Sequence, residues 1–500
     1  MTDLARGRPP EEAMRACLLA TALARSLRLP ESEAAAVYWA TLLRSVGCTA
    51  TSHEYAAVFG DDVAVRARAD VADTTMPREA LALLWAMHPD ERPGRRLRAL
   101  AATAPRAKRA SVEGARADCE VGARMARRFE LDPAVEQALL QVFERWDGKG
   151  APRRLRGEAI APAARLAAVA SAAVMFEQAD GRAAALDALG RWAGRALDPS
   201  LVSALVRDGG ELLDAAWPED AWVAAVAAEP WVRRRAGGAQ LDAIARAFAD
   251  AVDLKTPFLH GHSGEVAALA ERAAGALGLP GGQVAAVRRA GLFPDLGRAG
   301  VPTGTWETAT RLTTAEWELV RLHPYHTERI LGRADALAPL ARLAGMHHER
   351  LDGSGYHRGA PATMLDLPAR VLAAADVYQA LVSDRPHRPA YAPAQAAKLL
   401  EAEALDRDAV RAVIEAAGLR PEGRPGGPFG LTRRELEVLR LLVRGRSERQ
   451  IARELFISGS TVHTHVVHIY GKAEVSTRAG LAMFAMEHDL VRPGEGPKID

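Results

Sequence analysis

An internal repeat constrains the fold of this chain more than any other feature of its sequence. Residues 26–47 match residues 276–297 at one constant offset, and residues 144–150 match residues 349–355 at a shorter one. The first copy therefore carries extra residues in its middle. The second block has the pattern Glu-Arg-x-Asp-Gly-x-Gly, which is not typical of a helix. This match therefore argues against a chance similarity between alanine-rich helices. The sequence predicts a duplicated unit.

Composition indicates that the repeated units are helical. The chain has 500 residues, which is too many for a single hydrophobic core. It is 49% hydrophobic but only 5% aromatic, and long stretches rich in Ala, Leu and Arg favour helices over strands. We therefore predict an all-α fold class.

Charge, cysteine and hydropathy patterns restrict the compartment and the partners. The formal net charge is only +2, so contact with nucleic acid must come from a local cluster of charge. Cys17, Cys48 and Cys119 lie far apart and form no disulfide framework, which suits a reducing compartment. Neither a leader-type segment nor a run of about 18 apolar residues is present. We expect a soluble cytoplasmic protein without a membrane partner.

Proline, glycine and clustered charge interrupt the helical pattern at two places. The first break runs from Trp217 to Gly238, and the second from Arg420 to Pro428. The predicted organisation is a helical domain at 1–215, a linker at 216–240, a second helical domain at 241–418, a linker at 419–430 and a third domain at 431–490.

The second copy carries side chains with metal-ligand chemistry at dispersed positions. Asp376 lies in an apolar helical run, and a buried carboxylate needs a partner or a metal. Imidazole with carboxylate, and no thiolate, suits a hydrolytic pair of Fe, Mn or Zn ions better than a structural zinc. For any single residue the alternative is an ordinary hydrogen-bonded histidine or carboxylate. The candidates are His262, Asp295, His323, His347, His348 and Asp376.

The adjacent pair His347 and His348 carries a geometric expectation. Neighbouring side chains on a helix point about 100° apart. On a helix, these two histidines would therefore serve two neighbouring ions and could not both face one.

Between about residues 251 and 418 the chain resembles the HD-GYP family of metal-dependent phosphohydrolases. The likeness is carried by residues 347–356, His-His-Glu-Arg-Leu-Asp-Gly-Ser-Gly-Tyr, and by residues 369–376. Members are all-helical and hydrolyse phosphodiesters, notably cyclic di-GMP, with two or three metals that clamp the attacking and leaving oxygens. The resemblance implies that the six candidates are metal ligands. It also implies a cyclic nucleotide ligand bound by Asp352, Gly353, Gly355 and Tyr356.

Three departures from the family pattern bear on catalysis, for which Asp295 and Arg298 are the candidate residues. The histidine of the family's His-Asp dyad is Pro294 here, which removes a ligand and would strain a helix interior. The lysine that follows the dyad is Arg298, which keeps a positive charge for phosphate but does not readily shuttle a proton. The family's Gly-Tyr-Pro becomes Gly355-Tyr356-His357, which alters the grip on a guanine-type ligand.

The first copy departs further from the metal-binding pattern. Apolar or short side chains stand at several positions that should bind metal, so we interpret this copy as a helical scaffold, dimerisation or sensing module. The run from Glu144 to Gly148 is interpreted as a structural turn. The counterparts of the ligands are Glu12, Ser45, Val142, Phe143 and Ser171.

Helix signals follow one another closely after the second break. Thr432 and Glu435 form a capping-box pattern, and Gly445 ends the helix that they begin. A third helix, capped by Ser458, has a buried face that recurs at spacings of four, three and four. The remaining two helices are predicted at 448–455 and at about 477–487, which completes a compact four-helix bundle.

This bundle resembles the LuxR-type helix-turn-helix, whose third helix enters the major groove and whose dimers bind paired half-sites. The resemblance therefore implies double-stranded DNA and a homodimer as partners. The matched residues are Leu431, Thr432, Arg434, Glu435, Ile451, Ala452, Ser458, Thr461, Val462, His465 and Val466.

Base reading on the third helix is assigned to His463, Thr464 and Val467. Two of these positions, His463 and Val467, are often lysine in the family, and their replacement should lower nonspecific affinity and its salt dependence. The predicted DNA-binding set is Arg449, Ser458, Thr461, His463, Thr464, Val467, Lys472 and Arg478.

The sequence thus predicts two tandem HD-like helical domains followed by a four-helix helix-turn-helix domain. The leading interpretation is a DNA-binding transcription regulator whose HD-GYP-like region senses a ligand or mediates dimerisation. One alternative is a metal-dependent phosphodiesterase coupled to the DNA-binding domain, and another is a purely structural dimer scaffold. Pro294 and Arg298 favour sensing over turnover, whereas the retained ligands favour a functional site over a scaffold.

Overall fold

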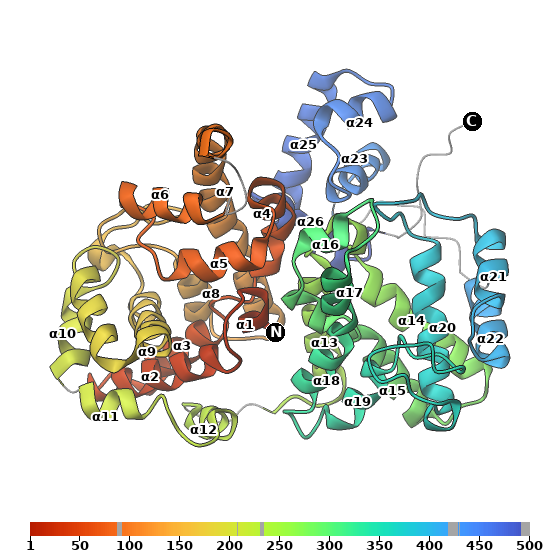
Figure 1. The fold of residues 1–500 in the computed structure, drawn as a ribbon, viewed down its shortest axis with the longest axis horizontal. Helices are drawn as coiled ribbons and strands as arrows, with labels where there is room; N and C mark the ends of the chain where they lie inside the picture. Colours follow the sequence, from red (N-terminus) through yellow and green to blue (C-terminus); the bar gives the residue numbers. More distant parts are fainter. Residues whose placement is uncertain (88–92, 208, 231–234, 419–428, 430, 492–500) are drawn as a thin grey trace. The chain divides into compact units, whose positions relative to one another are not determined.

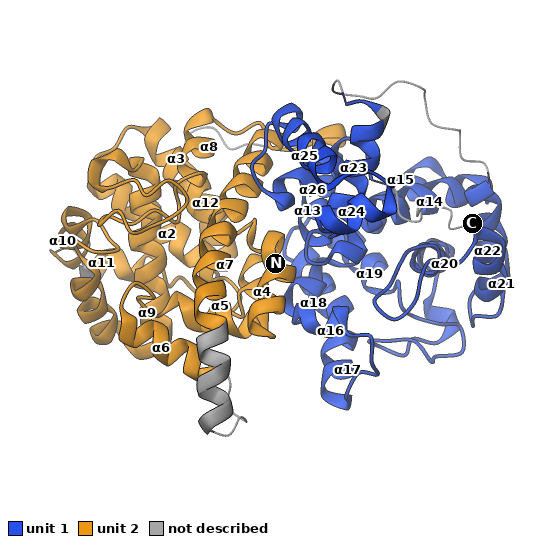
Figure 2. Cartoon of the chain, turned by 90° about the horizontal axis from the view of Figure 1, so that it is seen from above, with its two compact units in different colours: residues 1, 241–500 blue, residues 2–240 orange. Residues whose placement is uncertain are grey.

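Helices make up nearly all of the regular structure in the computed structural model of the chain (Figure 1). Within the described residues there is no extended strand, only two isolated β-bridges, so the predicted all-α class is confirmed. The chain divides into two compact units, drawn in separate colours in Figure 2: unit 2 holds residues 2–240, and unit 1 holds residues 241–500 with Met1. The described residues are 1–87, 93–207, 209–230, 235–418, 429 and 431–491.

Unit 2 is built on three helices that pack against one another: α2 (Glu12–Ser26), α3 (Glu31–Leu42) and α9 (Pro162–Trp192). Alanine and leucine dominate their buried faces, and the small alanine side chains let the helix axes approach closely. Around them lie α1 (Thr2–Ala5), α4 (Ser52–Phe59), α5 (Asp62–Asp70), α6 (Pro77–Ala86), α7 (Pro93–Arg128), α8 (Pro133–Leu139), α10 (Pro199–Arg207), α11 (Gly209–Asp214) and α12 (Ala221–Ala228), with 3-10 turns η1 (Cys48–Thr51) and η2 (Gly157–Ala159).

Unit 1 repeats this plan around α14 (His262–Ala276), α15 (Gly281–Leu292) and α20 (Leu367–Leu381), with α22 (Arg407–Gly418) against α14 and α20. Their buried side chains form one continuous apolar core, again rich in alanine. The other helices before the C-terminal bundle are α13 (Gly238–Asp253), α16 (Thr303–Glu307), α17 (Thr314–Arg321), α18 (His323–Leu331), α19 (Ala338–Gly345) and α21 (Pro393–Glu401), with 3-10 turns η3 (Pro257–Leu259), η4 (Leu296–Gly300) and η5 (Ala362–Met364).

Matching glycines in the two units make the same close backbone approach. A Cβ added to Gly297 would lie 2.0 Å from the carbonyl oxygen of His323. One added to Gly47 would lie 2.3 Å from the carbonyl oxygen of Asp118. These contacts need glycine at both positions, which supports the predicted duplication.

A buried glutamate organises the same loop in both units. The carboxylate of Glu144 accepts two backbone hydrogen bonds in unit 2, and that of Glu349 accepts two in unit 1. The interpretation of the Glu144 run as a structural turn fits these contacts. The four donors are the N–H groups of Arg153, Leu155, Arg358 and Ala360.

The C-terminal bundle contains the four helices that its sequence predicts: α23 (Arg433–Val443), α24 (Glu448–Glu454), α25 (Gly459–Ala473) and α26 (Arg478–Glu487). The capping box of Thr432 and Glu435 is present, and the side chain of Ser458 accepts the N–H of Thr461 at the start of α25. A second capping box, formed by Ser447 and Gln450, begins α24. These caps are local, which is why the sequence alone locates the helices.

The two predicted linkers differ in what the structure describes of them. The first, 216–240, includes α12, whose Ala221 and Ala225 are buried and which packs against α2. The second, 419–430, lies outside the described residues except for Phe429. Among the described helices, none combines the length and the apolar character that a bilayer crossing requires.

Candidate functional site

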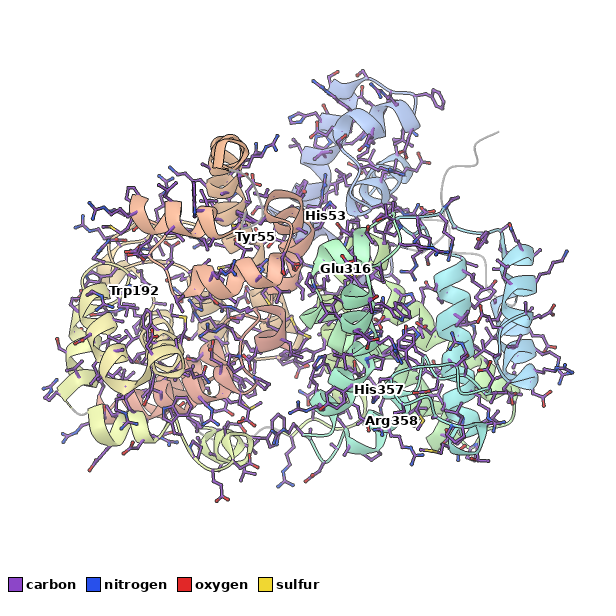
Figure 3. The ribbon with its side chains drawn as sticks, in the orientation of Figure 1. His53, Tyr55, Trp192, Glu316, His357 and Arg358 are labelled. Atoms are coloured by element: carbon purple, nitrogen blue, oxygen red, sulfur yellow. The ribbon has the colours of Figure 1, made fainter. Side chains whose placement is uncertain are left out.

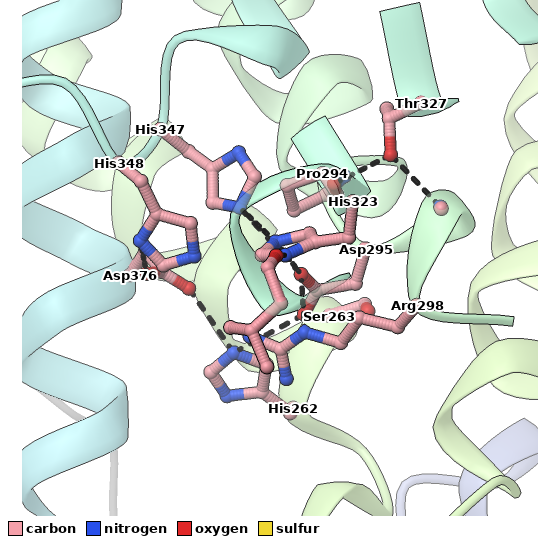
Figure 4. A network of polar contacts seen from close by, with 12 residues as sticks. His262, Ser263, Pro294, Asp295, Arg298, His323, Thr327, His347, His348 and Asp376 are labelled. Atoms are coloured by element: carbon pink, nitrogen blue, oxygen red, sulfur yellow. Dashed lines mark hydrogen bonds and ion pairs between the residues drawn. The ribbon is translucent and has the colours of Figure 1, made fainter. Parts of the chain in front are cut away.

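Six side chains from separate parts of unit 1 meet beside η4 and form what we call the His-Asp cluster (Figure 4). His262 begins α14, Asp295 directly precedes η4, His323 begins α18, His347 and His348 follow α19, and Asp376 lies in α20. The cluster contains two groups, each with ligand atoms within 4.8 Å of one another: His323 with His347 and His348, and His262 with Asp295 and Asp376.

Asp295 lies at the centre of the cluster and is 1% exposed. Its Oδ1 is 3.5 Å from Nε2 of His323 and 3.6 Å from Nε2 of His347, and its Oδ2 is 3.7 Å from Nε2 of His262. Nε of Arg298 lies 2.8 Å from Oδ1. Neither carboxylate oxygen accepts a hydrogen bond of ordinary geometry. A buried carboxylate in this state offers its lone pairs to a cation.

Backbone contacts fix which ring nitrogen two of the histidines present to the cluster. Nδ1 of His323 lies 2.7 Å from the carbonyl oxygen of Val320, and Nδ1 of His347 lies 2.7 Å from that of Ala344. Each Nδ1–H therefore donates to a carbonyl, so that Nε2 of each ring is an acceptor when the ring is neutral. The two Nε2 atoms are 3.2 Å apart. Paired acceptors at this distance suit ligands of a metal ion.

The charge states also suit metal ligation. Burial lowers the pKa of His323 and of His348 well below the usual value, and nearby positive charge adds to the effect. Burial alone would raise the pKa of Asp295, but the charge of Arg298 holds it well below its usual range. Burial alone would also raise the pKa of Asp376, but a hydrogen bond from His262 lowers it below its usual value. This carboxylate is therefore ionised as well. Neutral imidazoles and ionised carboxylates are the forms that bind metals.

The structure corrects the expectation for the adjacent histidines. Helix α19 ends at Gly345, so His347 and His348 lie in the turn that follows it. Their ring centroids are 4.0 Å apart, and both belong to the group that contains His323. The expectation assumed a helix, and that premise is wrong; which ions the two histidines serve remains a prediction.

The expected strain at Pro294 is also wrong. Helix α15 ends at Leu292, so Pro294 lies in a turn and not in a helix interior. Its carbonyl oxygen accepts a 2.8 Å hydrogen bond from Oγ1 of Thr327, which also accepts the N–H of Gly297. The substitution therefore removes an imidazole without disturbing the local backbone.

Arg385 is a second cation near the cluster, and the sequence analysis missed it. It follows α20 in the segment Asp384-Arg385-Pro386. Burial lowers its pKa to about 10, and the positive charge of Arg298 adds to this effect, while Asp376 opposes it. The available signal was an arginine nine positions after a predicted ligand, in a segment that proline keeps from being helical.

Three of the predicted nucleotide-binding residues shape a turn. Oδ1 of the exposed Asp352 accepts hydrogen bonds from the N–H and the hydroxyl of Ser354. Gly353 has a φ of 75°, in the left-handed region that favours glycine. A Cβ added to Gly355 would lie 2.4 Å from Cα of Glu349. These residues hold the loop in place, and their predicted ligand contacts remain predictions.

Tyr356 is the predicted nucleotide-binding residue that touches the cluster. Its ring stacks on that of His348, with centroids 4.6 Å apart and an angle of 28° between the planes. Trp317, which is 42% exposed, meets the Tyr356 ring edge-on at 5.6 Å. Arg358, labelled in Figure 3, follows Tyr356 by two positions. It forms a 2.6 Å ion pair with Glu328. An aromatic wall thus borders the His-Asp cluster.

The outward face of α25 in the C-terminal bundle carries the residues assigned to base reading. His463 and Val467 are 66% and 55% exposed, and Thr464 is also exposed. Nδ1 of His463 lies 3.4 Å from a carboxylate oxygen of Glu448. The opposite face is buried through Val462, Val466, Ile469 and Ala473, as the spacing predicts.

Lys472 is engaged inside the bundle. Its Nζ lies 2.7 Å from Oε2 of Glu435. Burial alone would raise the pKa of Glu435, but hydrogen bonds from Lys472 and Thr432 lower it to about 2. The pair ties α25 to the start of α23, so contact between Lys472 and DNA remains a prediction.

The other residues of the predicted DNA-binding set lie near the ends of helices. Ser458 and Thr461 are exposed at the start of α25, where Oγ of Ser458 accepts a 3.0 Å hydrogen bond from the N–H of Thr461. Arg449 is exposed on α24. Arg478 begins α26 and donates to the carbonyl oxygen of Arg446 at 3.2 Å. Their roles remain predictions.

Two protein families match separate parts of the chain. The HD domain matches residues 113–201 and 246–409, which together make up half of the chain. The luxR family of bacterial regulatory proteins matches residues 430–485.

Individual relatives agree with this division. The chain is 28% identical over 427 residues to the 3'3'-cGAMP-specific phosphodiesterase 3 of Vibrio cholerae, across 84% of this chain and 93% of the relative. A crystal structure of a cyclic GMP-AMP-specific phosphodiesterase from V. cholerae has a TM-score of 0.56 at 25% identity, and the match covers 84% of this chain and 96% of that one. The transcriptional regulatory protein LiaR of Bacillus subtilis is 42% identical over 74 residues, 15% of this chain and 35% of LiaR.

Proposed function

This chain belongs to the HD domain family and ends in a regulatory domain of the luxR family, and from this premise we propose that it hydrolyses a cyclic dinucleotide and binds double-stranded DNA. The proposal of hydrolysis is supported by the His-Asp cluster. At its centre, the buried carboxylate oxygens of Asp295 accept no hydrogen bond of ordinary geometry. Relatives named as phosphodiesterases of cyclic GMP-AMP support the substrate class.

The cluster residues fit a pair of divalent metals such as Fe, Mn or Zn. One ion would be held by His323, His347 and His348. The other would be held jointly by His262, Asp295 and Asp376. Three protein ligands for each ion leave positions open, as catalytic sites require. Bound metals would polarise a phosphodiester and favour attack by water.

The remaining residues have roles that follow from their chemistry. Arg298 lies on Asp295 and Arg385 carries a second positive charge near it, so both attract the phosphates of a cyclic dinucleotide. Tyr356 and Trp317 form an aromatic wall that suits stacking of a nucleobase. Together these groups orient a phosphodiester over the cluster with its base against the aromatic rings.

A second candidate function is sensing of the same ligand without hydrolysis. The specific observation in its favour is the 2.8 Å ion pair between Arg298 and Asp295, which places a guanidinium where the central carboxylate would otherwise meet a metal. The loss of an imidazole at Pro294 points the same way. The position of Pro294 outside any helix removes the expected backbone strain as a reason against catalysis.

The catalytic proposal is tested by supplying purified full-length protein with Mn²⁺ and either 3'3'-cyclic GMP-AMP or cyclic di-GMP, and by separating the products chromatographically. We expect linear dinucleotide to accumulate, His347→Ala to abolish it, and His468→Ala, an exposed histidine of α25, to leave it unchanged. Saturable binding of the dinucleotide without any product would establish sensing in place of hydrolysis. Neither binding nor product would refute both functions of the site.

The DNA-binding half is supported by the luxR-family match and by the outward face of α25. His463, Thr464 and Val467 on this face would meet base edges in the major groove. Binding as a homodimer follows from the family's use of paired half-sites. Control of transcription would then depend on the dinucleotide that the HD region binds.

Selection of bound duplexes from a random DNA library tests this half. The full chain should enrich a defined sequence with two half-sites. Val467→Glu should abolish enrichment, because a carboxylate on the recognition face is repelled by the DNA backbone. The control is Lys398→Glu at an exposed site on α21, which changes the charge by more than Val467→Glu does. This variant should bind DNA as the unmodified chain does. Absence of any enriched sequence with the unmodified chain would contradict specific DNA binding.

A further inference from the structure

Unit 2 contains a cavity of about 170 Å³ at the place that corresponds to the His-Asp cluster of unit 1. The repeat offsets equate residues of unit 2 with five of the six ligands and with Pro294, and these six side chains all line this one cavity. They are Glu12, Arg44, Ser45, Val142, Phe143 and Ser171. The first copy has therefore lost metal ligands but kept a hollow site.

Arg44 is the residue that gives this cavity its chemistry. Within the described part of the chain its guanidinium forms no ion pair or hydrogen bond, and its Nε is sealed from solvent. The guanidinium stacks on the ring of Phe143, with Cζ 4.9 Å from the ring centroid. An unpaired donor that is cut off from water, as Nε of Arg44 is, is costly, while the side chain as a whole remains partly exposed.

The other charged groups that line the cavity already have hydrogen-bond or ion-pair partners of their own. Arg6, for example, is bound by both carboxylate oxygens of Asp70. In addition, Glu12 pairs with Arg8, Arg145 pairs with Asp73, and the carboxylates of Asp3 and Glu144 accept backbone N–H groups. Arg44 is thus the cation of the cavity that remains for a ligand.

The size and lining of the cavity define the class of ligand. A volume of about 170 Å³ is well above the roughly 10–15 Å³ that a single water molecule needs. The cavity therefore has room for a group larger than water, such as a phosphate. Ser45 and Ser171 bring hydroxyl groups to the same walls as Arg44. A guanidinium fork with hydroxyl groups is a typical arrangement for tetrahedral oxyanions.

We propose that unit 2 binds a phosphate group, either as inorganic phosphate or as part of a phosphate monoester, on Arg44 in the cavity that replaces the metal site. The guanidinium takes over the role of the lost metal: it is a fixed positive charge that attracts phosphate oxygens. The site is separate from the His-Asp cluster and does not depend on whether that cluster hydrolyses its substrate.

Equilibrium dialysis of the full chain against radiolabelled inorganic phosphate, repeated with GMP as competitor, tests the proposal. We expect one saturable phosphate per chain and at least tenfold weaker binding by Arg44→Gln. Arg78→Gln, an exposed arginine of α6, should bind as the unmodified chain does. Displacement of phosphate by GMP would identify the phosphate monoester as a ligand, and failure to displace it would identify the free ion.

Thermal unfolding provides a second measurement that does not require Arg44→Gln to be fully stable. Phosphate should raise the Tm of the unmodified chain and of Arg78→Gln in proportion to the logarithm of its concentration. It should raise the Tm of Arg44→Lys, which keeps the charge but loses the planar fork, by much less. Phosphate binding of equal strength in Arg44→Gln and the unmodified chain would overturn the proposal, as would an absence of saturable binding in the unmodified chain.

Discussion

Substitution of Gly297 by alanine tests how the His-Asp cluster is held together. The new Cβ would lie 2.0 Å from the carbonyl oxygen of His323, whereas ordinary van der Waals contact begins at 3.4 Å. The difference, 3.4 − 2.0 = 1.4 Å, is the distance by which the two backbones must separate. The Cβ of His326, at 2.9 Å, blocks part of the way out. The start of α18, and with it the ring of His323, must therefore move.

A movement of this size is large for both stability and metal binding. Forcing an extra methyl group into a packed interior costs about 1–3 kcal/mol, and sometimes more. Metal–ligand bonds tolerate deviations of only about 0.2 Å. We therefore expect Gly297→Ala to lower the Tm and to detach His323 from its group in the cluster.

The assay is elemental analysis of the dialysed full-length protein, combined with calorimetric unfolding. Metal per chain should fall at least tenfold in Gly297→Ala. Gly275→Ala in α14, whose Cβ would meet nothing within 4 Å, should keep its metal. The repeat supplies a stricter control: Gly47→Ala has the same clash in unit 2, so it should lower the Tm and yet retain the metal. Unchanged metal content in Gly297→Ala would show that the close approach does not position His323.

Three other outcomes follow from the same contacts. Restoring the family's dyad with Pro294→His should increase the rate of cyclic dinucleotide hydrolysis, and an unchanged rate would show that this position is not limiting. His463→Ala should change which bases are enriched from a duplex library, whereas a uniform loss of affinity would make His463 a phosphate contact. Because the pKa of Glu435 is lowered from 4.5 to about 2, its ion pair stabilises the bundle above pH 4.5 and is lost as the pH falls toward 2. Lys472 is partly exposed, so Lys472→Met should lower the free energy of unfolding by only about 1 kcal/mol at pH 7, with a difference that shrinks below pH 4.5 in denaturant titrations. If the difference in unfolding free energy between Lys472→Met and the unmodified chain did not depend on pH, the stabilising role of the Glu435–Lys472 ion pair would be contradicted.

The sequence by itself determined the helices of the C-terminal bundle, because their signals are local. The capping boxes and the spacing of Val462, Val466 and Ile469 involve residues within one or two turns of each other. The sequence also indicated the six candidate ligands, which the structure brings together in two groups, and their binding of metal remains a prediction. The arrangement of His347 and His348 could not be predicted, because the sequence does not show that α19 ends before them.

Only the tertiary structure decided which side chains meet. His262 lies beside Asp376, 114 positions away, and Lys472 lies on Glu435, 37 positions away, through contacts that periodicity does not encode. The cavity of unit 2 is the clearest case: the sequence showed that ligands had been replaced, and it suggested a scaffold. Whether such replacements fill a site or leave it hollow depends on how helices far apart in the chain pack around it. In this protein they left a cavity with one unpaired guanidinium, that of Arg44.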